Sequence, residues 1–328
     1  QALKYDRLIG IEFDTACLLN ISPDHISSIE HKDFDDYLES KLKIFGKAKR
    51  VLINLDLPYL SIIQDNLQLD QTITFFSQKN SNADYFLEYF SYSENEIRVK
   101  IKTPSDSISC QAQLTGQFNA INILAALAIA DMFKVDKKSI QAGISVTEVP
   151  GRMEILETND QNILTLVDFA HNKLSFKKVF EFAEDLYSDY YKIAVFGSVG
   201  NKAKNRRYEL GLVAGQYADL CILTCDNNDL EDQKNINIEI AQGIEINNGS
   251  WQEIEDRRAA IQESFDIANQ HFQKTRQKVI LLILGRGPED SMRINGKDVP
   301  YLSDGEITQA CISTYNKSIN DLSKKKYF

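Results

Sequence analysis

The sequence has little of what marks a nucleic-acid binder, a disulfide-bonded protein or a membrane protein. Its 328 residues include 37 Lys and Arg against 47 Asp and Glu, and the net charge of −10 opposes binding to a phosphate backbone. The 5 cysteines are an odd number without metal-ligand spacing, which is typical of reduced thiols. The apolar runs fall short of the roughly 18 residues of a membrane span. We therefore expect a cytoplasmic protein without nucleic-acid or membrane partners.

The chain also lacks an initial Met. It begins at Gln1 and soon enters a strand-like run, TACLLN (15–20), from which we expect a piece of a longer protein. Its length suffices for two domains of ordinary size. The clearest boundary is VTEVPGRME, where a β-branched and polar stretch meets Pro-Gly before a new alternation begins. We place the two domains at 1–149 and 150–328.

Four uninterrupted apolar runs in the second half predict a parallel sheet. Amphipathic stretches separate the runs, and this alternation is typical of an α/β fold with both faces of the sheet covered. Ligands bind at the carboxyl ends of the strands in such sheets. The runs are ILTLVDFA (163–170), KIAVFGS (192–198), ADLCILTC (218–225) and KVILLILG (278–285).

The first half mixes helices and strands. DYLESKLKIF (36–45) has the apolar spacing of a helix, and VLINLD (51–56) is typical of a buried strand. Alternating segments between about 60 and 114 predict further strands. NAINILAALAIADMF (119–133) is apolar on nearly every turn, which predicts a buried helix.

Two side chains in the first half are candidates for metal binding. His25 follows a strand-like run with Asp24 beside it, and could bind Mg²⁺ or position a phosphate group. A helix-capping Asp24 with a surface His25 is the alternative. Lys41 shares a helical face with Tyr37 and Phe45, an apolar setting that would depress its pKa and favour a carbamate. The alternative is a Lys41 ammonium that reaches solvent.

Two asparagines and a Pro-Gly turn could contact a nucleotide. Asn119 and Asn122 lie one helical turn apart, so their amides could read a base edge together, and residues that merely begin a helix are the alternative. Arg152 lies on a turn that suits a phosphate-binding guanidinium. Asp168 ends a strand, where it could accept from a ribose hydroxyl. Surface salt bridges are the alternative for both charged side chains.

The loop FGSVGNKAKNRR (196–207) carries glycine followed by positive charge. It matches neither GxGxxG nor GxxxxGK[ST], so it is neither a dinucleotide nor a P-loop signature. A loop for an anionic substrate and a solvated basic loop both remain open.

The order of these segments resembles that of the Mur ligases and, within them, the MurE branch, the UDP-N-acetylmuramoyl-tripeptide synthetases. The resemblance covers nearly all of the chain and is specific, because many segments keep their order and spacing. They are NISPDH, YLESKLKIF, INLD, GQFNAINILAAL, VPGRMEIL, VDFAHN, FGSVG, TCDNNDLED, DRRAAI and GRGPED.

This resemblance implies an ATP-dependent ligase of peptidoglycan precursor synthesis. In that family ATP phosphorylates the terminal carboxylate of a UDP-muramoyl peptide, here UDP-MurNAc-L-Ala-D-Glu, and the amine of an incoming amino acid then displaces phosphate. The implied architecture is the C-terminal part of the central ATPase domain followed by a Rossmann-like domain with a mostly parallel sheet. The implied partners are small molecules with ATP and Mg²⁺, and we expect a monomer.

On the ATP side, the resemblance implies a metal and nucleotide site. His25 would ligate Mg²⁺, and Lys41 as a carbamate would help to hold a second metal. The nucleotide contacts would come from Asn119 and Asn122 at the adenine, Arg152 at the phosphates, and Asp168 at the ribose with His171 nearby.

On the acceptor side, the resemblance implies a site for the incoming amino acid. The diaminopimelate-adding enzymes have Asp-Asn-Pro-Arg where this chain has residues 226–229. Arg suits a distal carboxylate, whereas Asp229 would repel one and attract a distal ammonium, so we expect L-lysine or another diamino acid without that carboxylate. The remaining contacts would come from Arg207, Asp226, Asn227, Gly285 and Glu289.

The chain also departs from the family pattern. It lacks the Gly-Lys-Thr or Gly-Lys-Ser phosphate loop, an acidic metal ligand and the UDP-binding domain, all of which the family carries upstream, so we do not expect the fragment to catalyse alone. GKGHE has become GRGPE, which leaves room for a divergent paralogue with another acceptor. A folylpolyglutamate synthetase, a cyanophycin-synthetase-like ligase and a non-catalytic nucleotide-binding module are the alternatives.

Overall fold

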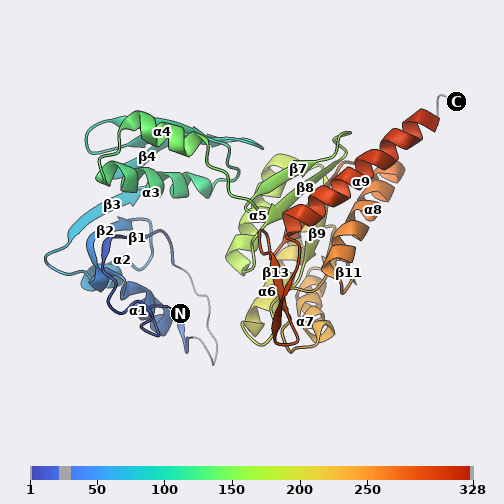
Figure 1. Ribbon diagram of the computed structural model, residues 1–328, viewed down its shortest axis with the longest axis horizontal. Coiled ribbons are helices and arrows are strands. Elements are labelled where there is room, and N and C mark those ends of the chain that lie inside the picture. The colour runs from blue at the N-terminus through green and yellow to red at the C-terminus, as the bar shows by residue number, and fades with distance from the viewer. Residues whose placement is uncertain (1, 22–30, 326–328) are drawn as a thin grey trace. The chain divides into compact units, whose positions relative to one another are not determined.

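The computed structural model describes residues 2–21 and 31–325, and the chain folds into two compact units, Gln1–Glu148 and Val149–Phe328 (Figure 1). Each unit has its own sheet and its own hydrophobic core. The division lies one residue before the boundary that the sequence predicts. Both units combine helices with largely parallel sheets, which confirms the predicted α/β class.

The first unit is built on a six-stranded sheet in the order β1-β2-β3-β4-β5-β6. Strands β1 to β4 run parallel, and β4 to β6 run antiparallel. In β5, Ile97, Val99 and Ile101 are buried while the basic residues between them are exposed, so one face of this part packs on the core. The strands are β1 Phe13–Leu18, β2 Ala48–Asn54, β3 Thr72–Ser77, β4 Tyr85–Tyr92, β5 Ile97–Lys102 and β6 Ser107–Ala112.

The helices of the first unit follow the predicted pattern with shifted ends. Ala120, Leu124 and Leu127 of α3 are wholly buried, which confirms the buried helix predicted over 119–133. Helix α1 begins earlier than predicted because the Asp33 carboxylate caps it by accepting from the Asp36 backbone N–H at 2.9 Å. The helices are α1 Phe34–Leu42, α2 Leu60–Asp65, α3 Asn119–Met132 and α4 Lys137–Ser145, with a short 3₁₀ turn at Phe45–Lys47.

The second unit is a six-stranded sheet in the order β11-β10-β9-β12-β8-β7. Its neighbouring strands pair parallel, except that the edge strand β7 runs antiparallel to β8. The four predicted apolar runs form β8, β9, β10 and β12, which are almost entirely buried. The strands are β7 Glu154–Glu157, β8 Ile163–Asp168, β9 Tyr191–Phe196, β10 Leu220–Leu223, β11 Trp251–Glu253 and β12 Val279–Leu284.

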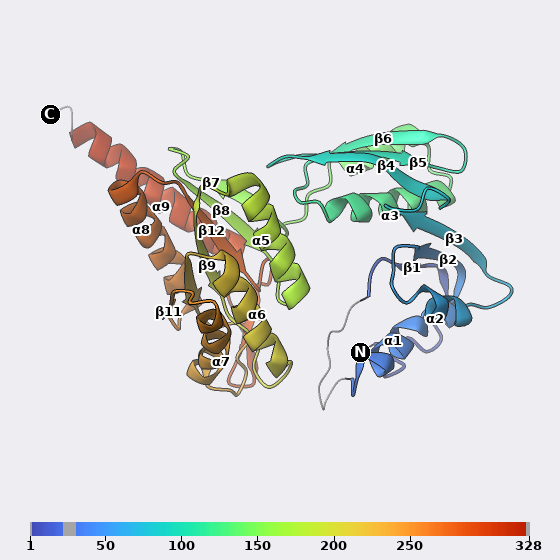
Figure 2. The same ribbon diagram turned by 180° about the vertical axis from the view of Figure 1, so that it is seen from behind.

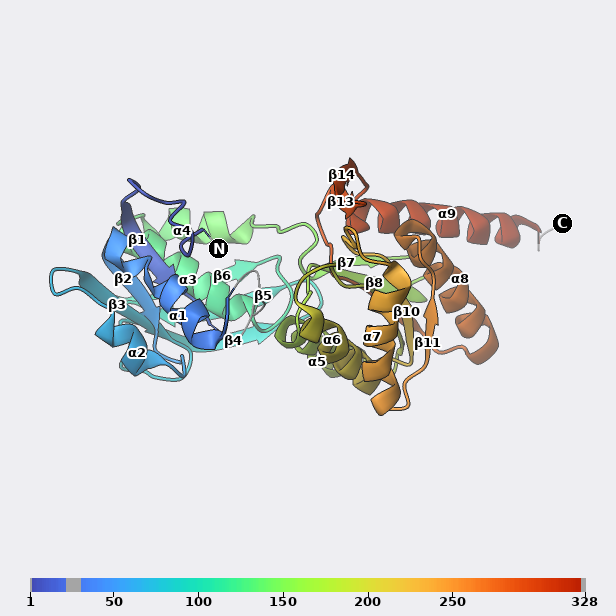
Figure 3. The ribbon, with the colours of Figure 1, turned by 90° about the horizontal axis from the view of Figure 1, so that it is seen from below.

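Helices cover both faces of this second sheet (Figures 2 and 3). On one face, Val167 of β8 shares a core cluster with Ile261 of α8 and Ile307 of α9. On the other face, the Phe196 ring of β9 meets the Phe176 ring of α5 edge to face, with centroids 5.1 Å apart. The helices are α5 Lys173–Tyr187, α6 Lys204–Tyr217, α7 Gln233–Ile246, α8 Arg257–Thr275 and α9 Asp304–Lys325.

A short antiparallel hairpin lies between β12 and α9. It consists of β13 Ser291–Ile294 and β14 Lys297–Pro300, and a single β-bridge joins its Ile294 to Asp229 in the loop after β10. Across 2–21 and 31–325, no helix has both the length and the apolar character needed to cross a bilayer.

Candidate functional site

Residues predicted to contact an amino acid meet at one edge of the second sheet. Strands β10 and β12 run in the same direction through the shared neighbour β9, so the loops that follow them emerge at the same edge. The loop after β10 carries Asp226 and Asn227, and the loop after β12 carries Gly285 and Glu289. Folding therefore brings together two segments that lie far apart in the sequence.

The Asn227 side chain connects three groups at this end of the sheet. Its Nδ2 donates to Glu289 Oε2 at 3.0 Å and lies 3.3 Å from Asp226 Oδ1. Its Oδ1 accepts from the Arg293 backbone N–H at 2.8 Å, which joins the loop to the hairpin. One amide thus holds two carboxylates close together. Such a pair of acceptors suits a cationic group such as an ammonium.

The surroundings of Asp226 and Glu289 disfavour the charged forms of both carboxylates, so the pKa of each is raised. Burial raises the pKa of Asp226, while the nearby Arg257 and Arg286 act in the opposite direction. Burial also raises the pKa of Glu289, the Asn227 hydrogen bond lowers it, and the charge of Asp226 raises it again. A cation bound between the two carboxylates would relieve this mutual repulsion. The geometry therefore favours binding of a positive group at this place.

Gly285 has a structural reason to be glycine. Its φ is +118°, a conformation that side chains with a Cβ rarely adopt. A Cβ on Gly285 would also lie 2.8 Å from Asp226 Oδ2. The absence of a side chain thus lets the backbone after β12 pass close to the Asp226 carboxylate.

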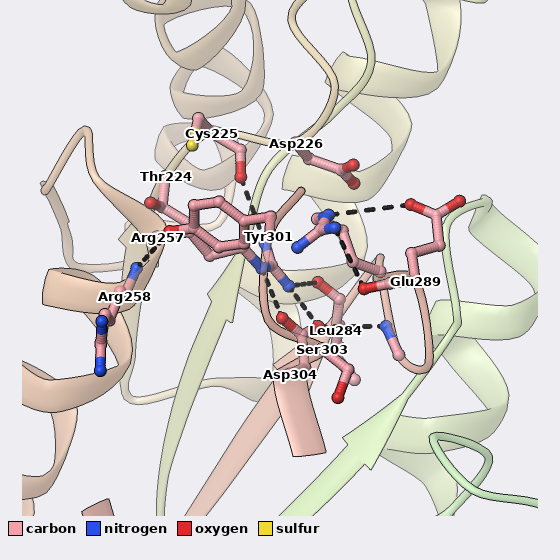
Figure 4. Close-up of polar contacts among 12 residues, drawn as sticks. Thr224, Cys225, Asp226, Arg257, Arg258, Leu284, Glu289, Tyr301, Ser303 and Asp304 are labelled. Atoms are coloured by element: carbon pink, nitrogen blue, oxygen red, sulfur yellow. Dashed lines mark hydrogen bonds and ion pairs between the residues drawn. The ribbon is translucent and has the colours of Figure 1, made fainter. Parts of the chain in front are cut away.

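Arg257, at the start of α8, holds the same edge together and was not predicted as a site residue. Its Nε and Nη2 donate to the two oxygens of Asp304, each at 2.7 Å, and both side chains are fully buried (Figure 4). Nη2 also donates to the Leu284 carbonyl at 2.9 Å, and Nη1 lies 3.4 Å from the Cys225 carbonyl. Arg257 therefore ties the ends of β10 and β12 to the start of α9.

Arg286 is a second unpredicted guanidinium, and it is also fully buried. Its Nη2 donates to the backbone carbonyls of Glu289, at 3.2 Å, and Ser291, at 2.6 Å. Its Nε lies 3.7 Å from Glu289 Oε2, and within the described residues Nε and Nη1 make no hydrogen bond. Arg286 thus shapes the loop after β12 and places a positive charge beside Glu289.

Arg207, which the sequence predicts at the incoming amino acid, is held by two glutamates and a backbone carbonyl. Its fully buried guanidinium donates to Glu231 at 2.8 and 2.7 Å, to Glu239 at 3.2 Å and to the Val199 carbonyl at 3.1 Å. These groups fix the loop after β9 to the loop after β10. They do not include Asp226, Asn227 or Glu289, and the contact of Arg207 with an amino acid stays a prediction.

The glycines of the loop after β9 serve close backbone packing. A Cβ on Gly197 would lie 2.1 Å from the Thr224 carbonyl oxygen, and one on Gly200 would lie 1.9 Å from that of Asn228. Both glycines therefore let this loop lie directly against the loop that carries Asp226.

The predicted nucleotide turn is held by Asp168. The buried Asp168 carboxylate accepts from the backbone N–H groups of Met153, at 2.8 Å, and Ala170, at 2.6 Å. Burial raises the pKa of Asp168, and these two hydrogen bonds oppose the shift. These contacts exclude the surface salt bridge as the role of Asp168. The carboxylate instead joins the Pro-Gly turn to the end of β8.

Two other residues predicted for the nucleotide lie beside Phe169. The exposed Arg152 guanidinium lies 4.6 Å from the centre of the Phe169 ring, and His171 Nδ1 lies 2.8 Å from the Phe169 carbonyl oxygen. The turn also touches the loop after β12, because a Cβ on Gly151 would lie 2.5 Å from the Pro288 nitrogen. The predicted nucleotide and amino-acid segments are therefore neighbours within the second unit.

In the first unit the two predicted asparagines are hydrogen-bonded to each other. Asn122 Nδ2 donates to Asn119 Oδ1 at 3.0 Å, and Asn119 Nδ2 donates to the Thr115 carbonyl at 2.7 Å. Phe118 occupies the N-cap of α3, and Asn119 and Asn122 lie in its first turn, as the alternative of residues that begin a helix also expects. Their amides do lie together as predicted, while contact with adenine stays a prediction.

The predicted metal site is only partly described. Lys41 Nζ lies 5.3 Å from the centre of the Tyr37 ring, which confirms that the two side chains share a face of α1. Asp24 and His25 lie outside the described residues. Within the ranges that the structure covers, no group of three or more His, Cys, Asp or Glu could hold a metal ion.

Comparison with known protein families gives matches in both units. Residues 1–130 match the Mur ligase middle domain, and residues 151–287 match the family described as Mur ligase, glutamate ligase domain. Together the two matches cover most of the chain.

Similar proteins span the boundary between the units. The chain is 32% identical over 322 residues to the UDP-N-acetylmuramoyl-L-alanyl-D-glutamate--L-lysine ligase of Enterococcus faecalis, covering 96% of this chain and 61% of that protein. It is 29% identical over 326 residues to the corresponding 2,6-diaminopimelate ligase of Caldanaerobacter subterraneus, covering 97% and 63%. A solved structure of a 2,6-diaminopimelate ligase matches with a TM-score of 0.57 and 27% identity, covering 96% and 63%. The chain spans about three fifths of the length of these relatives.

Proposed function

The chain belongs to the Mur ligase family, and from that premise we propose that its protein is an ATP-dependent ligase that adds a diamino acid to UDP-MurNAc-L-Ala-D-Glu. A carboxylate is a poor electrophile, so the peptide carboxylate is first phosphorylated by ATP. The amine of the incoming amino acid attacks the acyl phosphate, forms the amide bond and releases phosphate. The similarity to ligases that act on this peptide supports the proposal.

The observation that carries the proposal is the clamp of two carboxylates by Asn227. Asp226 and Glu289 share the Asn227 amide nitrogen at 3.3 and 3.0 Å, next to a backbone that Gly285 keeps free of side chain. Free amino acids carry an ammonium group, and this pair of acceptors suits its three donors. The amine must lose a proton before it attacks, and a carboxylate with a raised pKa is a better proton acceptor than an ordinary one.

For the second substrate, we propose that the turn after the domain boundary binds the ATP phosphates. The exposed Arg152 guanidinium offers a cation, and the Asp168 carboxylate holds the turn in place while it keeps lone pairs for a ribose hydroxyl. Asn119 and Asn122 are proposed at the adenine because their amides lie together at the start of α3. His25 and a carbamylated Lys41 are proposed as ligands of Mg²⁺.

L-lysine is the acceptor that we propose. The lysine ligase and the diaminopimelate ligase are 32% and 29% identical to this chain, which is too small a difference to decide between them. The choice rests instead on Asp229, whose carboxylate is 21% exposed and attracts a distal ammonium. Arg at this position would exchange that preference for a distal carboxylate.

The test is phosphate release by the full-length protein. The reaction would contain ATP and UDP-MurNAc-L-Ala-D-Glu, with L-lysine, L-ornithine or meso-diaminopimelate as the acceptor. We expect phosphate release that depends on L-lysine. Asp229→Arg should abolish this lysine-dependent release. Glu289→Gln should lower it at least tenfold by removing one charge of the clamp, since a charge-assisted hydrogen bond contributes about 1.5–3 kcal/mol.

Asp290→Asn is the matched control, because it removes a charge from the next, exposed position. It should leave the lysine-dependent rate within about twofold of wild type. The proposal fails if a folded protein that still binds ATP releases phosphate with none of the acceptors. The choice of lysine fails if diaminopimelate is the better substrate, or if Asp229→Arg loses lysine without any gain for diaminopimelate.

A further inference from the structure

Asp229 has a cationic partner on the neighbouring hairpin. Its Oδ1 lies 3.1 Å from Nε of Arg293, on β13, and its Oδ2 accepts from Asn201 Nδ2 at 3.0 Å. Nη1 of Arg293 also lies 3.1 Å from Asp298 Oδ1, on β14. Arg293 therefore bridges two carboxylates and can release one while it keeps the other.

Backbone contacts keep the two side chains adjacent. The Asp229 N–H donates to the Arg293 carbonyl at 3.0 Å, and the Asn295 N–H donates to the Asp229 carbonyl at 2.6 Å. The Arg293 backbone N–H donates to the side-chain oxygen of Asn227, and the side-chain nitrogen of Asn227 donates to Glu289. The hairpin thus lies directly against the loop that carries the proposed acceptor contacts. The Arg293 side chain is 48% exposed, so it has room to change rotamer.

We propose that Arg293 is a specificity-determining residue, which competes with the distal ammonium of the acceptor for Asp229 and offers a partner to a distal carboxylate. This inference rests on the proposed function. Without Arg293, Asp229 would be an uncompensated negative charge that strongly favours a distal ammonium. With Arg293, part of this negative charge is compensated and a guanidinium lies beside it, so the site still favours a distal ammonium but repels a distal carboxylate less.

Diaminopimelate carries both an ammonium and a carboxylate at its distal end, whereas lysine has the ammonium alone. Arg293 therefore weakens the preference for lysine over diaminopimelate that Asp229 alone would produce. A half-exposed ion pair contributes at most about 1 kcal/mol, so the expected effect on each acceptor is only severalfold. The effects have opposite signs for the two acceptors, which makes their ratio the informative quantity.

The experiment measures kcat/KM of full-length wild type and Arg293→Gln for three acceptors, with ATP and the UDP-peptide saturating. The acceptors are L-lysine, meso-diaminopimelate and L-norleucine, which has the length of lysine without its ammonium. We expect Arg293→Gln to raise kcat/KM for lysine roughly threefold and to lower it for diaminopimelate roughly threefold. The ratio then shifts about tenfold, while the norleucine value stays unchanged.

Two control variants separate specificity from a structural role. Lys297→Gln removes a positive charge from the same hairpin outside the Asp229 ion pair, and it should leave the ratio unchanged. Arg293→Lys keeps the charge and should keep the ratio close to wild type. An unchanged ratio in Arg293→Gln overturns the inference, and so does an equal loss for all three acceptors. Release with none of the acceptors by wild type overturns the proposed function itself and this inference with it.

Discussion

Two arginine–aspartate pairs in the second unit use the same chemistry but differ in burial. Arg257 and Asp304 are both fully buried and pair through two hydrogen bonds of 2.7 Å. Arg293 is half exposed and pairs with Asp229 through one contact of 3.1 Å, with a second carboxylate nearby. A buried pair is costly to break, whereas an exposed pair is easily exchanged. The first pair is therefore suited to hold the site together and the second to tune its specificity.

Breaking the buried pair should have the largest effect. Asp304→Asn leaves the Arg257 guanidinium charged in a fully buried place, and we expect it to lower the free energy of unfolding by about 3–5 kcal/mol. Urea unfolding followed by circular dichroism measures this change. The start of α9 and the loop after β12 should also lose protection from hydrogen exchange, because Asp304 Oδ2 accepts from the Gly287 N–H at 3.1 Å.

A double variant sharpens this first prediction. Replacing both partners, as in Arg257→Met with Asp304→Leu, removes the charge left unpaired on Arg257 and should recover part of the stability that Asp304→Asn loses. The recovery is partial because Asp226 then loses the compensating charge of Arg257. A loss below about 1 kcal/mol in Asp304→Asn would mean that the pair contributes no more than an exposed one, and the contrast between the two pairs would disappear.

The Arg207–Glu231 pair is intermediate in burial, and its contribution to the free energy of unfolding should depend on pH. Arg207 is fully buried but Glu231 is 15% exposed, and their hydrogen bonds lower the pKa of Glu231 from 4.5 to about 2. The pKa is lower in the folded state, so the pair stabilises the fold above about pH 4.5 and loses this contribution as the pH falls toward 2. The excess stability of wild type over Glu231→Gln should shrink by about 3 kcal/mol over this range.

Urea unfolding at a series of pH values measures that excess. Glu239→Gln is the matched control, because Glu239 contacts the same guanidinium at 3.2 Å but is 38% exposed. At pH 7 it should lower the free energy of unfolding by less than Glu231→Gln does, because an exposed ion pair contributes little. A stability difference between wild type and Glu231→Gln that is constant from pH 5 to pH 2 would contradict the assignment of this titration to Glu231.

The smallest effect on stability is expected at the exposed pair. Arg293→Gln should change the free energy of unfolding by less than about 1 kcal/mol, even though it shifts the preference between acceptors. Thermal unfolding of Arg293→Gln beside Asp304→Asn gives the comparison directly. Equal losses of stability in the two variants would mean that the hairpin is held by this ion pair, and its role in specificity would have to be reconsidered.

Much of the fold was predictable from the sequence because strands and helices leave local patterns. The runs that form β8, β9, β10 and β12 are mainly apolar, since the sheet is covered on both faces. The apolar helix over 119–133 was likewise confirmed in α3. The start of α1 was missed because it depends on a cap by Asp33 that precedes the apolar spacing.

The site was only partly predictable. The motifs led to Asp226, Asn227, Gly285 and Glu289, and the structure brings these residues together. The motifs did not predict the buried charged side chains that hold the loops in place. DRRAAI stood out as a segment, but nothing in it distinguishes the buried Arg257 from its neighbour Arg258, which the structure leaves exposed. Arg207 was predicted at the amino acid, and its two glutamate partners were not foreseen.

The α/β class and the family could be inferred from the chain alone, because hydrophobic periodicity and short motifs in a fixed order are properties of neighbouring residues. The pairing of each arginine with its acid depended on folding. Arg207 and Glu231 are 24 residues apart, Arg257 and Asp304 are 47 apart, and Arg293 and Asp229 are 64 apart. No local pattern carries such pairings, and the burial that separates a scaffold pair from an exchangeable one depends on which surfaces the sheet and helices cover.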